Sequence, residues 1–158
     1  MMMAGAADRE SGFTLLELMI VMVIIAILAT IAYPSFIEQI RKGRRSDAIT
    51  ALNQIQQAQE RWRVNCPCYA GSITAANAGC PATACATTSG LGLAGTSGNS
   101  YYNLSISGVS ATGYTLTATA TGAQASDTRC ASMTVTLAGA NLTYTASPAA
   151  NANACWNR

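Results

Sequence analysis

Histidine is absent from this chain of 158 residues, and charged side chains make up only 10% of it. After Glu60, the single side-chain carboxylate is that of Asp127. General acid–base catalysis needs a positioned titratable group, and nucleophilic catalysis needs a nucleophile beside a base. Neither pair can readily be assembled in the second half of the chain. The sequence therefore argues against an enzyme and indicates no cofactor.

Aromatic residues are also scarce, at 6% of the chain, and Ala, Thr, Ser and Gly dominate its second half. The hydrophobic core must therefore be modest and built largely from small side chains. The length is enough for one domain plus an appendage. Six cysteines without a histidine favour disulfides in an oxidising compartment over a metal site.

A long apolar run near the N-terminus is the feature around which the chain is organised. From Phe13 to Tyr33 the only ionisable side chain is that of Glu17. About 20 apolar residues are enough for a helix to cross a bilayer, and a carboxylate inside such a segment costs about 2.5 to 3.5 kcal/mol at mid-membrane. An opposite charge brought by another subunit would compensate that cost, so Glu17 is a candidate assembly signal.

The run Gly-Phe-Thr-Leu-Leu-Glu at residues 12–17, followed by a hydrophobic helix, resembles the processing site of type IV prepilins. The resemblance implies that a prepilin peptidase removes residues 1–12 as a leader by cutting between Gly12 and Phe13, and then N-methylates Phe13. It also implies that Glu17 pairs with the terminal amine of a neighbouring subunit. Such a subunit waits in the inner membrane of a Gram-negative type of bacterium before it enters an extracellular filament.

Residues 13–64 predict one long helix. Residues 13–34 are its transmembrane and polymerisation half, in which Pro34 predicts a kink or local loosening rather than a stop. Residues 35–64 are amphipathic, with a Gln-rich face that includes Gln59. The apolar face, which Arg44 interrupts and which we expect to cover a sheet, recurs at three- and four-residue spacing: Ile37, Ile40, Ala48, Ala51, Ile55, Ala58 and Trp62.

A basic cluster lies just beyond the apolar run, at Arg41, Lys42, Arg44 and Arg45. We interpret it as a collar that is solvated or faces lipid headgroups and limits how far the helix enters the membrane. One alternative is a contact with Glu38, Asp47 or Glu60 of a neighbouring subunit. Another is direct DNA binding, although a cluster so close to the membrane half would be buried in a filament.

Residues 65–100 form a segment of low regularity that carries four cysteines: Cys66, Cys68, Cys80 and Cys85. A disulfide between Cys66 and Cys68 is sterically poor, because the two flank a single proline. We therefore expect pairs between the first two cysteines and the last two, without choosing between the two arrangements. A zinc site made by all four thiolates is the alternative, although its spacings are imperfect.

Residues 101–158 carry alternating apolar and polar residues in short stretches separated by turn signals, which predicts antiparallel hairpins. The fold class is therefore α+β, with the long helix packed on a four-stranded antiparallel sheet. A disulfide between Cys130 and Cys155 would close a loop of about 26 residues and contribute roughly 3 to 4 kcal/mol. Such a pair also resembles the C-terminal disulfide-bounded region of pilins, and residues 113–156 are similar to the PilE-like branch, often called minor pilins.

The resulting hypothesis is a structural subunit of a type IV pilus that supports motility, adhesion or DNA uptake. Its implied partners are other pilin subunits, the prepilin peptidase, the inner-membrane assembly machinery and membrane lipid. One alternative is a pseudopilin of a type II secretion system, although the tail after Cys130 has no carboxylate for a calcium site. Another is a filament-borne adhesin or DNA-uptake receptor, which charge does not support, because only Arg129 and Arg158 lie beyond residue 63.

Overall fold

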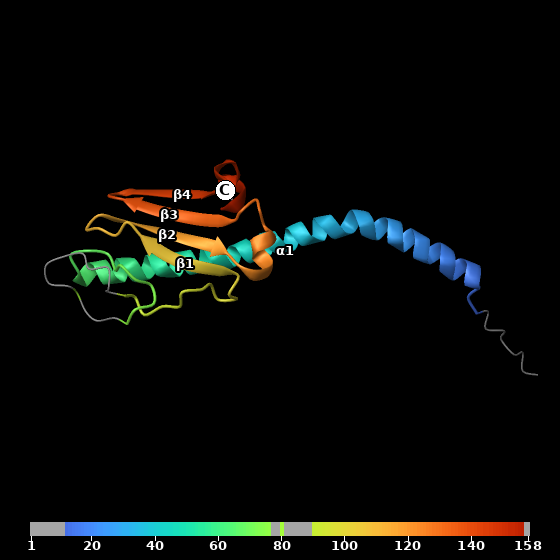
Figure 1. The fold of residues 1–158 in the computed structure, drawn as a ribbon, viewed down its shortest axis with the longest axis horizontal. Helices are drawn as coiled ribbons and strands as arrows, with labels where there is room; N and C mark the ends of the chain where they lie inside the picture. Colours follow the sequence, from blue (N-terminus) through green and yellow to red (C-terminus); the bar gives the residue numbers. More distant parts are fainter. Residues whose placement is uncertain (1–11, 77–79, 81–89, 157–158) are drawn as a thin grey trace, which may run out of the picture. The chain divides into compact units, whose positions relative to one another are not determined.

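The computed structural model describes residues 12–76, 80 and 90–156 (Figure 1). A long helix precedes a four-stranded antiparallel sheet in which the strands follow chain order, β1-β2-β3-β4. This architecture confirms the predicted fold class. The elements are α1 (Leu15–Asn65), β1 (Tyr102–Ser107), β2 (Gly113–Ala120), η1 (Gly122–Ser126), β3 (Ser132–Ala138), β4 (Asn141–Ser147), η2 (Ala149–Asn151) and α2 (Ala152–Cys155).

The chain divides into two compact units, Met1–Glu38 and Gln39–Arg158. We call the second unit the head. Helix α1 is a single continuous helix that includes the boundary between the two units, and Pro34 lies inside it. The proline is therefore not a helix stop, in agreement with the sequence, and it costs α1 one backbone donor.

Short connections fix the meander of the sheet. Strands β3 and β4 are joined by the two residues Gly139 and Ala140, and Gly139 adopts a φ of 62°, a left-handed conformation that glycine adopts without strain. The N–H of Gly139 donates to the carbonyl oxygen of Thr112, 2.8 Å away, and so ties this turn to the turn before β2.

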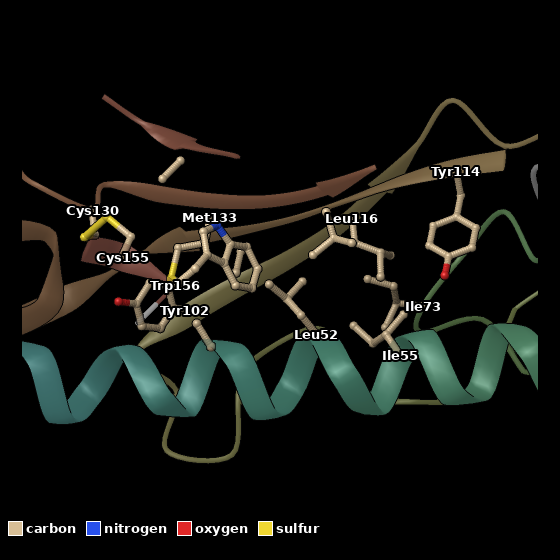
Figure 2. Packing of buried hydrophobic residues seen from close by; sticks show 14 of the residues in the cluster. Leu52, Ile55, Ile73, Tyr102, Tyr114, Leu116, Cys130, Met133, Cys155 and Trp156 are labelled. Atoms are coloured by element: carbon tan, nitrogen blue, oxygen red, sulfur yellow. A yellow bond between two sulfur atoms is a disulfide. The ribbon is translucent and has the colours of Figure 1, made fainter. Parts of the chain in front are cut away.

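The core of the head lies between α1 and one face of the sheet (Figure 2). Leu52 and Ile55 come from the helix, and Leu116, Met133 and Val135 come from the central strands. All five are at most 2% exposed. The apolar residues that recur with the helical period on α1 therefore pack against those that recur with the strand period on β2 and β3, and together they form one apolar layer.

Helix α2 closes the core at the C-terminus. The indole N–H of Trp156 donates to the carbonyl oxygen of Thr145 at 2.8 Å, and its ring packs edge-on against Tyr144, with ring centroids 4.9 Å apart. Trp156 itself is a core residue. The C-terminal segment is thus held against strand β4 rather than left as a tail.

Candidate functional site

The first candidate site is the start of α1. The side chain of Thr14 caps the helix, because its Oγ1 accepts a hydrogen bond from the N–H of Glu17 at 3.2 Å. Glu17 lies in the first turn, where the positive end of the helix dipole favours a carboxylate. Gly12 and Phe13 come just before the helix, and Phe13 is 84% exposed. The residues of the predicted processing site are therefore accessible in the isolated chain.

Behind this start, the apolar part of α1 presents bare hydrophobic side chains. Its most apolar 18-residue window has a mean hydropathy of 2.8 and is not buried anywhere in the chain. By length and composition, this helix can cross a membrane. Side chains such as Leu16 and Ile31, at 68% and 73% exposed, need lipid or other helices to cover them.

The second site is a buried polar anchor inside the head, formed by Arg45, Asp127, Gln124 and Tyr102. Arg45 donates to both carboxylate oxygens of Asp127, from Nε at 2.7 Å and from Nη2 at 2.9 Å, and both side chains are at most 4% exposed. Nε2 of Gln124 donates to Asp127 at 2.9 Å and to the Tyr102 hydroxyl at 3.1 Å. Burial raises the pKa of Tyr102. The anchor fastens the η1 connection to α1.

Sequence reasoning missed this anchor and misplaced one arginine. Arg44 does not interrupt the buried row. It is half-buried and stacks on the Tyr101 ring, 4.6 Å from the centroid, whereas Arg45 takes the core position. Arg45 is thus not part of a solvated collar. The sequence feature that could have indicated this anchor is Asp127. It is an isolated carboxylate in a nearly charge-free half of the chain, and a buried carboxylate needs a cation.

Gln59 was also misplaced, on the polar face of the helix. It is fully buried, where its amide exchanges two hydrogen bonds of 2.8 Å with the backbone of Ala70. This pair holds the start of the cysteine-rich segment against α1. A helical glutamine can therefore belong to the buried face when its side-chain amide forms hydrogen bonds with backbone groups that have no partner in a sheet.

Disulfides link the candidate cysteines, and two of the bonds join residues that the structure describes. Cys66 is bonded to Cys80, with 5.2 Å between their Cα atoms, and Cys130 is bonded to Cys155, with 5.7 Å between theirs. Cys68 is disulfide-bonded as well, whereas Cys85 lies outside the described residues. The Cys66–Cys80 bond uses two of the four thiols that a zinc site would need.

Two family models match the chain, and together they cover residues 8–134. Residues 34–134 match the model of the type IV minor pilin ComP, a DNA uptake sequence receptor. The chain belongs to this family. Residues 8–33 match the prokaryotic N-terminal methylation motif. The comparison with curated proteins found no match.

Family membership settles what kind of protein this is. The minor pilin is a structural subunit of a type IV pilus, as the processing site and the α+β fold already indicated. Because the family is one of structural pilins, membership implies a protein that is not an enzyme. Family membership also makes DNA a candidate ligand. The small number of arginines in the second half of the chain did not suggest this ligand.

Proposed function

We propose that this minor pilin binds DNA at the surface of a type IV pilus during DNA uptake. The observation that carries the proposal is the match of residues 34–134 to a family described as a DNA uptake sequence receptor. This range covers most of the head, from α1 through the start of β3. The proposal assigns DNA binding to the head and assembly to the apolar part of α1.

The charges of the head support a polyanionic ligand. From residue 61 to the C-terminus, the sequence has four arginines and a single carboxylate side chain, that of Asp127. That carboxylate is 1% exposed and is neutralised by Arg45. The described surface beyond Glu60 therefore presents no side-chain carboxylate to repel phosphate, and Arg61 and Arg129 are exposed on it.

The proposal for assembly follows the sequence. The prepilin peptidase cuts between Gly12 and Phe13, and Phe13 becomes the methylated N-terminus. Glu17 then pairs with the Phe13 amine of a neighbouring subunit, and the helix around Pro34 packs with the same neighbours. Support comes from the methylation-motif match and from the exposure of every described side chain from 12 to 36.

The partners and location follow from this assembly. The precursor waits in the inner membrane of a Gram-negative bacterium, where lipid covers the apolar half of α1. The peptidase and the inner-membrane assembly machinery then deliver it into a filament with other pilins. As a minor subunit, it decorates that filament rather than forming the bulk of it.

DNA binding is tested directly with the full chain in a non-ionic detergent. We expect it to shift the fluorescence anisotropy of a labelled duplex, with an affinity at 50 mM salt in or above the range of non-specific binding, about 10⁻⁴ to 10⁻⁶ M. A variant with a substitution in the buried core of the head is unsuitable as a control. The matched control is therefore a major pilin in the same detergent. No shift up to about 100 µM protein would contradict the proposal.

A further inference from the structure

A polar groove of about 490 Å³ lies in the head between α1 and the segment that leads into β1. We call it the α1 groove. Its lining includes Ile40, Gly43, Arg44 and Asp47 of α1, and Asn99 and Tyr101 of the segment before β1. One cation, Arg44, and one anion, Asp47, therefore face the same hollow, and both side chains are half-buried.

Arg44 holds its guanidinium in an orientation that suits a phosphate. Its Cζ lies 4.6 Å from the centroid of the Tyr101 ring. This contact occupies one face of the planar group, whereas its N–H donors lie in the plane. None of these donors makes a hydrogen bond with another residue that the structure describes. A guanidinium held in this way is ready to bind two phosphate oxygens at once.

Asp47 presents the opposite charge one turn further along α1. Its carboxylate accepts hydrogen bonds from Nδ2 of Asn99 at 3.2 Å and from the backbone N–H of Asn99 at 3.3 Å. These bonds fix the carboxylate and leave it further acceptor sites. Residues three apart on a helix are neighbours, but Arg44 is turned toward Tyr101 and Asp47 toward Asn99. The groove therefore holds two opposite charges that are oriented and do not neutralise each other.

The α1 groove follows the apolar part of the helix at a short distance along the chain. Between Glu17 and Glu38, residues 18–37 carry no charge, and 20 helical residues measure about 30 Å, the thickness of the hydrocarbon core. The headgroup layer adds about 5 to 8 Å on each side. Arg44 comes seven residues after Ile37, or about 10 Å of helix, and helical side chains lean toward the N-terminus. Along α1, the charges of the groove thus follow the membrane core at the depth of the lipid headgroups.

A zwitterionic lipid headgroup matches these charges. In phosphoethanolamine, a short ethylene link joins a phosphate to a primary ammonium. The phosphate accepts from Arg44, and the ammonium, which has three N–H donors, donates to Asp47. A purely anionic headgroup would bring its phosphate near the Asp47 carboxylate without an ammonium to compensate that charge.

We propose that the α1 groove binds the headgroup of a phosphoethanolamine lipid while the precursor resides in the membrane. The inference rests on the membrane location of the precursor and does not depend on DNA binding. Arg41 and Lys42, which precede the groove, attract phosphate in general, whereas the groove selects the headgroup. A bound headgroup fixes how far α1 enters the bilayer before the subunit joins a filament.

The test uses the full chain in a non-ionic detergent and native mass spectrometry, which counts bound lipids. Two short-chain probes with identical acyl chains are titrated, one with a phosphoethanolamine and one with a phosphoglycerol headgroup. We expect one phosphoethanolamine lipid to bind with a Kd about five- to tenfold lower than that of the phosphoglycerol lipid, because only its ammonium donates to Asp47. Equal Kd values, or tighter binding of the phosphoglycerol lipid, would overturn the inference whatever the DNA experiment shows.

Variants locate the binding in the groove. Asp47→Asn keeps an acceptor for Asn99 and loses the charge, so the preference for phosphoethanolamine disappears, whereas Arg44→Gln weakens the binding of both lipids. The matched control is Glu60→Gln/Arg61→Gln, which removes one charge of each sign at exposed positions near the other end of α1 and keeps the preference. If Asp47→Asn retains the wild-type preference, or if the control loses it, the α1 groove is not the site.

Discussion

The carboxylate of Asp127 accepts two hydrogen bonds from the guanidinium of Arg45, which lies 82 residues earlier in the chain. Both groups are almost fully removed from solvent. Replacing Arg45 with alanine leaves a buried, unpaired carboxylate, and we expect the free energy of unfolding to fall by about 3 to 5 kcal/mol. Urea unfolding of the full chain in detergent measures this, because both tryptophans, Trp62 and Trp156, lie buried in the head.

The control for this pair is the removal of both charges together. Arg45→Met/Asp127→Leu replaces the ion pair by apolar groups and is expected to recover most of the stability lost in the single variant. Arg61→Ala, at an exposed arginine, should change the free energy of unfolding by less than about 0.5 kcal/mol. Equal losses in Arg45→Ala and Arg61→Ala would show that the anchor does not hold the head together.

The C-terminal disulfide is expected to be a main stabiliser of the head. Cys130 and Cys155 are 25 residues apart and fully buried, so Cys130→Ser/Cys155→Ser should lower the free energy of unfolding by about 3 to 4 kcal/mol or more. The bond between Cys66 and Cys80 closes a shorter loop of 14 residues, and Cys80 is exposed. Its removal should cost less when measured by the same unfolding experiment. The reverse order would contradict the packing described above.

Alkaline pH is expected to destabilise the head through Tyr114. Burial is the main cause that raises the pKa of its hydroxyl to about 12, with Glu60 adding to the rise. The folded chain therefore holds this proton more tightly than the unfolded chain, whose tyrosines titrate near 10. The stability from this difference is complete below about pH 10 and is lost as the pH rises from 10 to 12.

Unfolding midpoints at pH 9, 10 and 11 check this expectation, with Tyr114→Phe as the comparison. The variant should lose less stability over this range than the wild type. Some dependence should remain, because burial also raises the pKa values of Tyr69 and Tyr102. Identical slopes for the two proteins would exclude Tyr114 as the source.

Glu17 is expected to matter for assembly and not for folding. It belongs to the first unit of the chain rather than to the head, and its side chain is exposed. We expect Glu17→Gln to remove most of this subunit from sheared filaments, as measured by immunoblotting, while the unfolding midpoint of the head stays within error. Thr50→Val, a change on the exposed side of α1, is the control that should assemble normally.

Local patterns predicted the elements of this fold well and its long-range polar contacts poorly. The alternation from Tyr114 to Ala120 predicts β2, because adjacent side chains on a strand point to opposite faces. Choosing between Arg44 and Arg45 requires knowing which way the helix faces the sheet, and adjacent helical residues differ by about 100°. The pairing of Arg45 with Asp127 depends on tertiary structure alone, so no sequence spacing could reveal it.

The outer face of the sheet illustrates the same limit. The sequence shows that threonines alternate along single strands, but only the register places Thr117 beside Thr134 and Thr145 in the same row. A surface spread over four strands appears only when the strands are paired. The processing site, in contrast, is a contiguous stretch, and for that reason the sequence could indicate it directly.

The central claim, that this chain is a processed pilus subunit, is tested most directly by the intact mass of the protein isolated from sheared filaments. The account predicts a chain that begins at Phe13, carries one added methyl group at its N-terminus and lacks residues 1–12. A protein that is absent from the filaments, or that begins unmodified at one of its first three methionines, would contradict it.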